Sequence, residues 1–161
     1  MLVDDDTVDP RDHLRLASSR PFALIHNAEG DPIDEPLAYG TPRPALTSIA
    51  VVVDGDRLEA TATLALNGRV LTGQCMGDAS DRTAVVASAT LGALAALLDC
   101  EAEVESATIL DIAGRDVALS ILRLNSASPH DLLVGSAIVR GDVEDATARS
   151  VLSALNRRLS R

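Results

Sequence analysis

The stretch 83-TAVVASATLGALAALL-98 sets the fold, because its pattern returns later in the chain as 143-VEDATARSVLSALNRRLS-160. Both stretches have helical periodicity and contain the motif A-L-x-x-x-L near their ends. A shift of 61 positions superimposes the pairs Leu91/Leu152, Ala93/Ala154, Leu94/Leu155 and Leu98/Leu159. Three alternating strand patterns precede each helix, which indicates two copies of one βββα unit. The sequence therefore predicts an α+β fold of tandem βββα repeats over residues 46–161, with two small antiparallel sheets, or one composite sheet, packed on two helices.

The first copy has three strand patterns joined by tight turns. Ser48–Val53 leads through an Asp-Gly-Asp turn into Leu58–Leu66, in which apolar residues alternate with polar ones, as in a half-buried antiparallel strand. Asn67-Gly68 is a strong type I′ hairpin signal, because both central residues of that turn need a positive φ. The third strand is predicted at Val70–Met76.

The second copy repeats this order with a looser final connection. Its strands are predicted at about Glu103–Ile112, Asp116–Leu124 and Leu132–Arg140. Gly114 makes the first turn, whereas Asn125–His130 contains a proline and predicts a longer loop.

The two helices differ in charge. The first, Thr83–Leu98, carries no charged residue over about 24 Å of helix. A helix that is apolar around most of its circumference is covered on more than one side, and this one is too short and too rich in alanine to span a membrane. We expect it to pack on its own sheet and also on a second helix or another chain. The residues proposed for that interface are Ala87, Ser88, Leu91, Gly92 and Ala95.

Both helices begin after a loop that carries glycine and acidic residues. The aspartates can act as N-caps, whose oxygens accept hydrogen bonds from the free N–H groups of the first helical turn. The same oxygens could instead accept hydrogen bonds from a small cationic or amino ligand. The candidate ligand-binding residues are Gly77, Asp78, Ser80, Gly141 and Asp142.

Residues 1–45 form an acidic, proline-rich segment. Six of the seven prolines lie within the first 44 residues, together with seven aspartates and two glutamates. Proline withholds backbone donors and the acidic residues repel each other, so we expect a largely disordered tail or linker that could bind another protein. The sequence leaves open a short helix at Arg11–Ser18 and a docked extended segment at Pro21–Ile25.

Composition argues against nucleic-acid and membrane partners. The formal net charge is −10, and all 14 basic residues are arginine. Phosphate binding needs a concentration of positive charge. The chain comes nearest to one on the last helix, with Arg149, Arg157, Arg158 and Arg161, and these arginines are also explained by their favourable position near the negative C-terminal end of the helix dipole. Base stacking is nearly unavailable, because the only aromatic residues are Phe22 and Tyr39.

The cysteines and the N-terminal residues predict a cytoplasmic protein. Cys75 and Cys100 match neither a metal motif nor a disulfide framework, which indicates reduced thiols and small hydrophobic side chains. The stretch MLVDDDTVDPRD lacks the positive and apolar regions of an export signal.

No motif in the sequence predicts catalysis. His13, His26 and His130 are scattered and show no metal-ligand spacing. Neither a G-x-S-x-G nucleophile motif nor a phosphate-binding G-x-x-x-x-G-K-[ST] loop occurs. We therefore expect a protein that is not an enzyme and that needs no cofactor and no metal.

Several short motifs resemble the C-terminal regulatory, or LeuA-type dimerisation, domain of the 2-isopropylmalate synthase family. They are Gly73-Gln74-Cys75-Met76-Gly77, Gly135-Ser136-Ala137, Asp142, Ala146 and Ala154-Leu155-Asn156-Arg157-Arg158-Leu159, and the resemblance covers roughly residues 47–161. The first helix-start loop differs, because Asp78-Ala79-Ser80-Asp81 stands where that family has a proline-valine-aspartate run. The resemblance implies a domain without catalytic residues that pairs with itself and binds an end-product amino acid near the helix-start loops.

The sequence thus predicts a stand-alone regulatory or assembly module that forms a homodimer and binds a small metabolite such as an amino acid. One alternative is a Roadblock-like protein-interaction scaffold, whose fold has one continuous five-stranded sheet and an N-terminal helix. A further alternative, which charge and aromatic content disfavour, is an RNA-binding α+β module.

Overall fold

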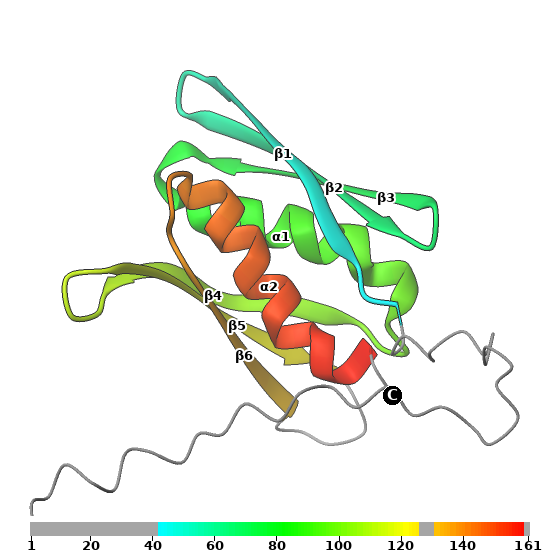
Figure 1. Ribbon diagram of the computed structural model, residues 1–161. Coiled ribbons are helices and arrows are strands. Elements are labelled where there is room, and N and C mark those ends of the chain that lie inside the picture. Colours follow the sequence, from blue (N-terminus) through cyan, green and yellow to red (C-terminus); the bar gives the residue numbers. More distant parts are fainter. Residues whose placement is uncertain (1–41, 126–130, 160–161) are drawn as a thin grey trace, which may run out of the picture. The chain divides into compact units, whose positions relative to one another are not determined.

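The computed structural model describes residues 42–125 and 131–159 (Figure 1). The chain divides into two units, Met1–Ala38 and Tyr39–Arg161, and the fold described here belongs to the second. The helix considered at Arg11–Ser18, the segment Pro21–Ile25 and most of the loop Asn125–His130 lie outside the described residues.

The first βββα copy forms one antiparallel sheet followed by a helix. Its strands pair in the order β1-β2-β3 and are β1 (Ala45–Asp54), β2 (Arg57–Leu66) and β3 (Arg69–Asp78). Asn67 and Gly68 have φ values of 52° and 75°, as the predicted type I′ turn requires. The chain then forms the short 3₁₀ helix η2 (Ala79–Asp81), helix α1 (Arg82–Leu94) and a closing 3₁₀ turn, η3 (Ala95–Leu97).

The second copy forms a separate sheet of the same kind. Its strands pair in the order β4-β5-β6 and are β4 (Ala102–Asp111), β5 (Asp116–Leu124) and β6 (Asp131–Ile138), followed by helix α2 (Val143–Leu159). The predicted α+β fold of tandem βββα repeats is therefore confirmed, and the strands form two sheets rather than one composite sheet.

The two copies match residue by residue. Each first strand has an irregularity at the same place, between Leu46 and Ser48 in β1 and between Val104 and Ser106 in β4. In the first sheet Ala62 pairs with Gly73, and in the second sheet Ser120 pairs with Gly135. This register defines equivalent positions in the two copies.

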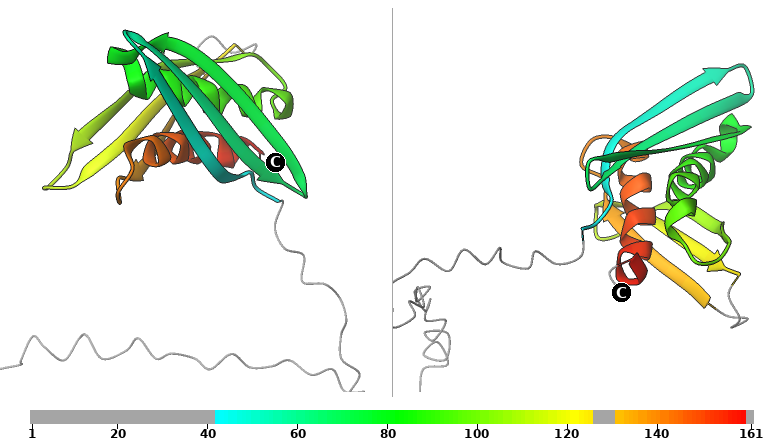
Figure 2. Two further views of the ribbon diagram at one scale, coloured as in Figure 1. Left: turned by 90° about the horizontal axis from the view of Figure 1, so that it is seen from above. Right: turned by 90° about the vertical axis from the view of Figure 1, so that its right-hand side faces the viewer.

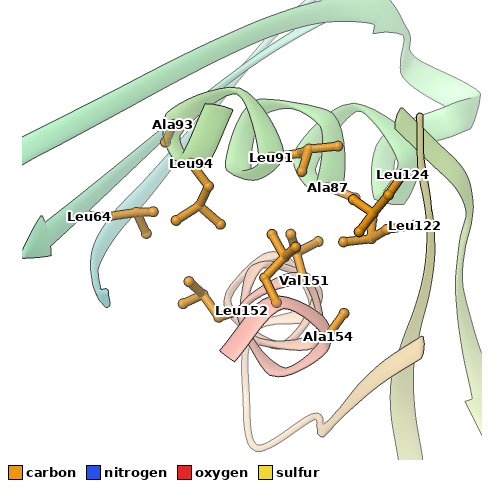
Figure 3. Packing of buried hydrophobic residues seen from close by; sticks show 11 residues of the cluster. Leu64, Ala87, Leu91, Ala93, Leu94, Leu122, Leu124, Val151, Leu152 and Ala154 are labelled. Atoms are coloured by element: carbon orange, nitrogen blue, oxygen red, sulfur yellow. The ribbon is translucent and has the colours of Figure 1, made fainter. Parts of the chain in front are cut away.

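The two helices lie side by side between the two sheets (Figures 1 and 2). Helix α1 packs on β2 and β3 of its own sheet and on β4 of the other. Helix α2 packs on β5 and β6 and reaches β1. Each helix is thus covered by both sheets and by the other helix. The cluster between the helices includes Leu64 from β2, Leu94 from α1, Leu122 from β5 and Val151 from α2 (Figure 3).

This arrangement explains why α1 has no charged residue after its first position. Val86 and Ala89 face the first sheet, where they join a buried cluster with Leu58, Ala60 and other residues. Ala87 and Leu91 instead join the cluster that includes α2. Of the two neighbours expected for the second side of α1, a second helix or another chain, the structure shows the helix α2. Strand β4 of the second sheet also packs on α1.

Two glycines allow the helices to approach their sheets closely. A Cβ added to Gly73 would lie 2.1 Å from the carbonyl oxygen of Ala89 in α1. A Cβ added to Gly135 would lie 2.0 Å from the carbonyl oxygen of Ser150 in α2. Any side chain at either position would therefore push the helix away from the strand.

Candidate functional site

An open surface groove of about 940 Å³ lies between the C-terminal half of α1 and β4. We call it the α1–β4 groove. It is lined by Ser88, Leu91, Gly92, Ala95 and Leu98 from α1 and the turn after it, by Asp99, Cys100 and Glu101 from the connection, and by Ala102, Glu103, Val104 and Asn125.

This groove contains four of the five residues proposed from the sequence for an interface. Ser88 is half-buried, Gly92 and Ala95 are exposed, and Leu91 reaches the groove from the core. The fifth residue, Ala87, is fully buried in the cluster shared with α2. Ala87 and Leu91 therefore contribute mainly to the interior of their own chain, and the accessible part of the proposed interface is the groove floor.

The groove has an apolar floor and an acidic rim. Asp99, Glu101 and Glu103 are its charged lining residues, and none of the described lining residues is basic. Oε1 of Glu103 is 3.0 Å from Nη1 of Arg123. Nη2 of the same arginine is 2.8 Å from Oε2 of Glu105. A ligand with an apolar part and a positive charge would fit this groove better than an anion.

The helix-start loops are used for capping. The backbone N–H of Ser80 donates a 2.8 Å hydrogen bond to Asp78, and the backbone N–H of Glu144 donates a 2.9 Å hydrogen bond to Asp142. Hydrogen bonding with Ser80 lowers the pKa of the Asp78 carboxyl. Hydrogen bonding with Glu144 lowers the pKa of Asp142, and the charge of Arg82 adds to this effect. Each carboxylate is thus held in its charged form at a helix start.

The structure also brings the two helix-start loops together. Arg82 at the start of α1 forms an ion pair with Glu144 in the first turn of α2. Gly77 lies against α1, since an added Cβ would meet the Val85 side chain at 2.5 Å, whereas Gly141 has open space around it. The five residues proposed for ligand binding therefore lie at the ends of α1 and α2 that the Arg82–Glu144 pair joins, but none of them lines the α1–β4 groove.

A second groove occupies the equivalent place in the other copy. It lies between α2 and β1 and has a volume of about 560 Å³. The lining residues from α2 occupy the positions equivalent to those of α1 in the first groove: Leu152 for Leu91, Ser153 for Gly92 and Asn156 for Ala95. Its charged lining residues are Arg43 and Arg149, whereas those of the α1–β4 groove are acidic. The sequence indicated only the helical side of the α1–β4 groove and gave no sign of the second groove, because each groove forms between a helix and a strand of different copies.

Metal-ligating residues do not cluster in the described part of the chain. No group of three or more His, Cys, Asp or Glu residues could hold a metal ion within residues 42–125 and 131–159, and all three histidines lie outside these ranges. Cys75 and Cys100 are free and half-buried, and they pack against different core clusters. No described helix is long and apolar enough to cross a membrane.

No protein-family model matches this chain, and no curated protein matches its sequence. The resemblance to the LeuA-type domain remains a prediction from short motifs. In the structure these motifs lie where the helices meet their sheets: Gly73 and Gly135 at the close contacts, and Ala154–Leu159 at the end of α2.

Proposed function

We propose that this chain is a non-catalytic regulatory or assembly module that works as a homodimer. The observation that carries the proposal is the exposure of large hydrophobic side chains on strands whose inner faces already pack on the helices. They are Val52, Val53, Val70, Met76, Leu110, Leu132, Val134 and Ile138, with Ile112 just after β4. Large apolar patches on a folded surface mark contacts with other molecules.

The charged residues of the described surface support a structural role. Asp78 and Asp142, whose pKa values are lowered, both cap helices. Arg123 and Arg149, whose pKa values are raised by neighbouring carboxylates, both form exposed ion pairs. Each of these shifts favours the form that the group already has at neutral pH, whereas a general acid or base needs a pKa near the working pH.

The LeuA-type resemblance agrees with this proposal. That resemblance implies a tandem βββα domain that pairs with itself, and the tandem βββα fold is present. A cytoplasmic setting fits the free thiols of Cys75 and Cys100. A Roadblock-like scaffold is less well supported, because its continuous five-stranded sheet does not match two separate three-stranded sheets.

Self-association is tested by sedimentation equilibrium of the full chain up to high micromolar concentration. We expect a mass of two chains, because the exposed apolar strands need a cover. A monomer at every concentration would contradict the proposed function.

We further propose that the module binds a small metabolite with an amino group, such as an amino acid, in the α1–β4 groove. Asp78 and Asp142 already accept backbone hydrogen bonds, whereas Asp99 and Glu101 lie on the open rim of the groove. Binding there would influence assembly through β4, which forms one wall of the groove and one edge of the second sheet.

A thermal-shift screen with branched-chain amino acids, their amines and nucleotides tests this binding. We expect amino compounds to raise the melting temperature, and the increase to disappear in Ala95→Leu, which fills the groove from an exposed position. Ala65→Leu, an exposed position on β2 away from the groove, is the control. The absence of any shift, or an equal shift in Ala95→Leu, would exclude this ligand site.

A further inference from the structure

The outer face of the second sheet is apolar along two neighbouring strands. In β5 the buried residues Ala118, Ser120 and Leu122 point toward the helices, so Val117, Leu119 and Ile121 point outward. In β6 the outward residues Leu132, Val134 and Ile138 are 49%, 61% and 46% exposed, and the exposed Ser136 lies between Val134 and Ile138 on the same face. Leu110 of β4 pairs with Val117 and extends this surface to the third strand. We call the seven apolar residues the β4–β6 outer face.

The first sheet provides an internal comparison, because its register makes the positions equivalent. Ile121 pairs with Val134 in the second sheet, whereas Thr63 pairs with Thr72 at the same place in the first. In the central strand of the first sheet, Thr61 occupies the position equivalent to Leu119, and Glu59 the position equivalent to Val117. The large apolar side chains that the first sheet does expose are Val52, Val53, Val70 and Met76, and all four lie on its edge strands.

Comparing the two sheets shows which outer-face residues the βββα fold does not itself require. Each outer face belongs to one copy of the βββα unit, and the first copy shows that threonine and glutamate are tolerated on the outer side of the central strand. The fold therefore does not require Ile, Leu and Val at the equivalent positions of β5. Since α1 and α2 both pack on the inner faces, the described part of the chain leaves the β4–β6 outer face uncovered. Its composition indicates a surface that another sheet or chain covers.

We propose that the β4–β6 outer face of one copy packs face to face on the same face of a second copy. This inference rests on the proposed homodimer and names the surface that forms it. Two copies of one largely apolar face present the same residues to each other about a twofold axis, and their facing side chains can interdigitate at a sheet separation of about 10 Å.

The size of the face suits a stable dimer. Three strands spaced about 4.8 Å apart, with about eight residues each at about 3.3 Å, give a flat area of roughly 14 by 27 Å. This flat area is roughly 380 Å² per copy, and the relief of the side chains raises the accessible area toward the value of about 800 Å² per partner in a standard interface. Stable protein interfaces bury about 1,200–2,000 Å².

Charged groups are placed at one end of the face rather than at its centre. Arg123 follows Leu122 on β5 and forms ion pairs with Glu103 and Glu105 of β4. Such a compensated cluster is compatible with the polar rim of an interface, which remains in contact with water. The apolar centre at Leu119, Ile121 and Val134 contains no charge.

Sedimentation equilibrium of full-length variants tests the surface. Ile121→Lys places a charge at the centre of the face, and we expect its dissociation constant to rise at least about 100-fold. Leu119→Thr with Ile121→Thr copies the residues of the first sheet and should have a similar effect while keeping good strand formers in β5. Thr63→Lys, at the position equivalent to Ile121, is the matched control and should change the constant by no more than about twofold.

Circular dichroism and thermal melting establish that each variant is folded, and the threonine double variant supplies the result if Ile121→Lys unfolds. Loss of the dimer in both β5 variants, with a dimeric Thr63→Lys protein, supports the proposal. A dimeric wild type whose β5 variants remain equally dimeric overturns this surface while the homodimer stands. A monomeric wild type overturns both, and would mean that residues 1–41 or a different protein covers the face.

Discussion

Gly73 and Gly135 show how a single missing side chain positions a helix. An added Cβ at either residue would lie within about 2 Å of helix backbone atoms, far inside van der Waals contact. Backbone atoms in a packed helix cannot move aside as a flexible side chain can. The close fit of each helix on its third strand therefore depends on glycine at that strand position.

We predict that Gly135→Ala lowers the free energy of unfolding by about 1–3 kcal/mol, since α2 must shift away from β6. Chemical denaturation measures this change. Gly92→Ala is the control, because its added Cβ would come no closer than 3.8 Å to another residue. Alanine within a helix should stabilise the protein by about 0.5–1 kcal/mol. Equal effects at the two positions would show that close packing at Gly135 is not the cause.

A buried hydroxyl pair distinguishes the core of the second copy from that of the first. The Oγ atoms of Ser120 and Ser150 are 2.5 Å apart, and Ser150 also donates to the carbonyl oxygen of Thr147 at 2.7 Å. The equivalent positions in the first copy are the buried alanines Ala62 and Ala89. The fold thus accepts either a matched polar pair or a matched apolar pair.

We predict that Ser150→Ala costs about 1–3 kcal/mol, because the fully buried Ser120 hydroxyl loses its partner. Ser120→Ala with Ser150→Ala should cost much less than this, since the double variant reproduces the alanine pair of the first copy. A double-mutant cycle in urea measures the coupling. Additive losses from the two single variants would contradict a direct interaction between the hydroxyls.

At the scale of whole elements, capping aspartates fix where α2 begins. Asp142 directly precedes Val143, and its carboxylate accepts a hydrogen bond from the N–H of Glu144. The pKa of Asp142 is lowered in the folded chain, so the protein is stabilised when this group is charged. That contribution is complete above the unfolded pKa of about 3.9 and disappears as the pH falls through the lower folded value.

We predict that Asp142→Ala loses about 1 kcal/mol of stability at pH 7, whereas Asp142→Asn loses less because asparagine also caps helices. Denaturation series between pH 7 and pH 2 provide the test. The difference between wild type and Asp142→Asn should narrow below about pH 4, where Asp142 is protonated first in the unfolded chain and, at lower pH, in the folded chain. A difference that stays constant with pH would mean that the charge of Asp142 does not contribute.

Element types were predictable from the sequence because each carries a local signal. The alternation in Leu58–Leu66 located β2, and Asn67-Gly68 located its turn. Helix α1 ends at Leu94 and gives way to a 3₁₀ turn, although the predicted helix continued to Leu98. The neighbours of α1 were not predictable as closely, because an apolar helix surface has no signal that distinguishes α2 and β4 from a separate chain.

At the scale of the whole molecule, the grooves and the outer faces arise from contacts between distant segments. The α1–β4 groove joins Ser88–Leu98 to Ala102–Val104 and Asn125, and the sequence proposal for an interface found only its helical side. The β4–β6 outer face became visible only when register showed which alternate residues point away from the helices. Alternation predicts two faces for a strand, but it does not state which face the helices cover.

Salt dependence gives a prediction for the whole molecule. Each chain carries a formal charge of −10, so in the proposed dimer the two copies would repel each other while their apolar faces attract. Raising NaCl from about 0.05 to 0.5 M shortens the Debye length from roughly 14 to 4 Å and should strengthen the dimer several-fold. Sedimentation equilibrium across this range measures the effect. A dimer that weakens with salt would indicate attraction through ion pairs instead of apolar packing.

The duplicated architecture has a consequence for how this protein can change over time. A substitution at Gly73 must suit the packing of α1 on its sheet, and a substitution at Gly135 must suit that of α2. The two outer faces point away from the interior, so a substitution on one of them need not disturb the helices. Thr63 and Ile121 differ in this way at equivalent positions. The duplicated unit thus lets the surface chemistry of one sheet differ from that of the other while the packing of the helices stays the same.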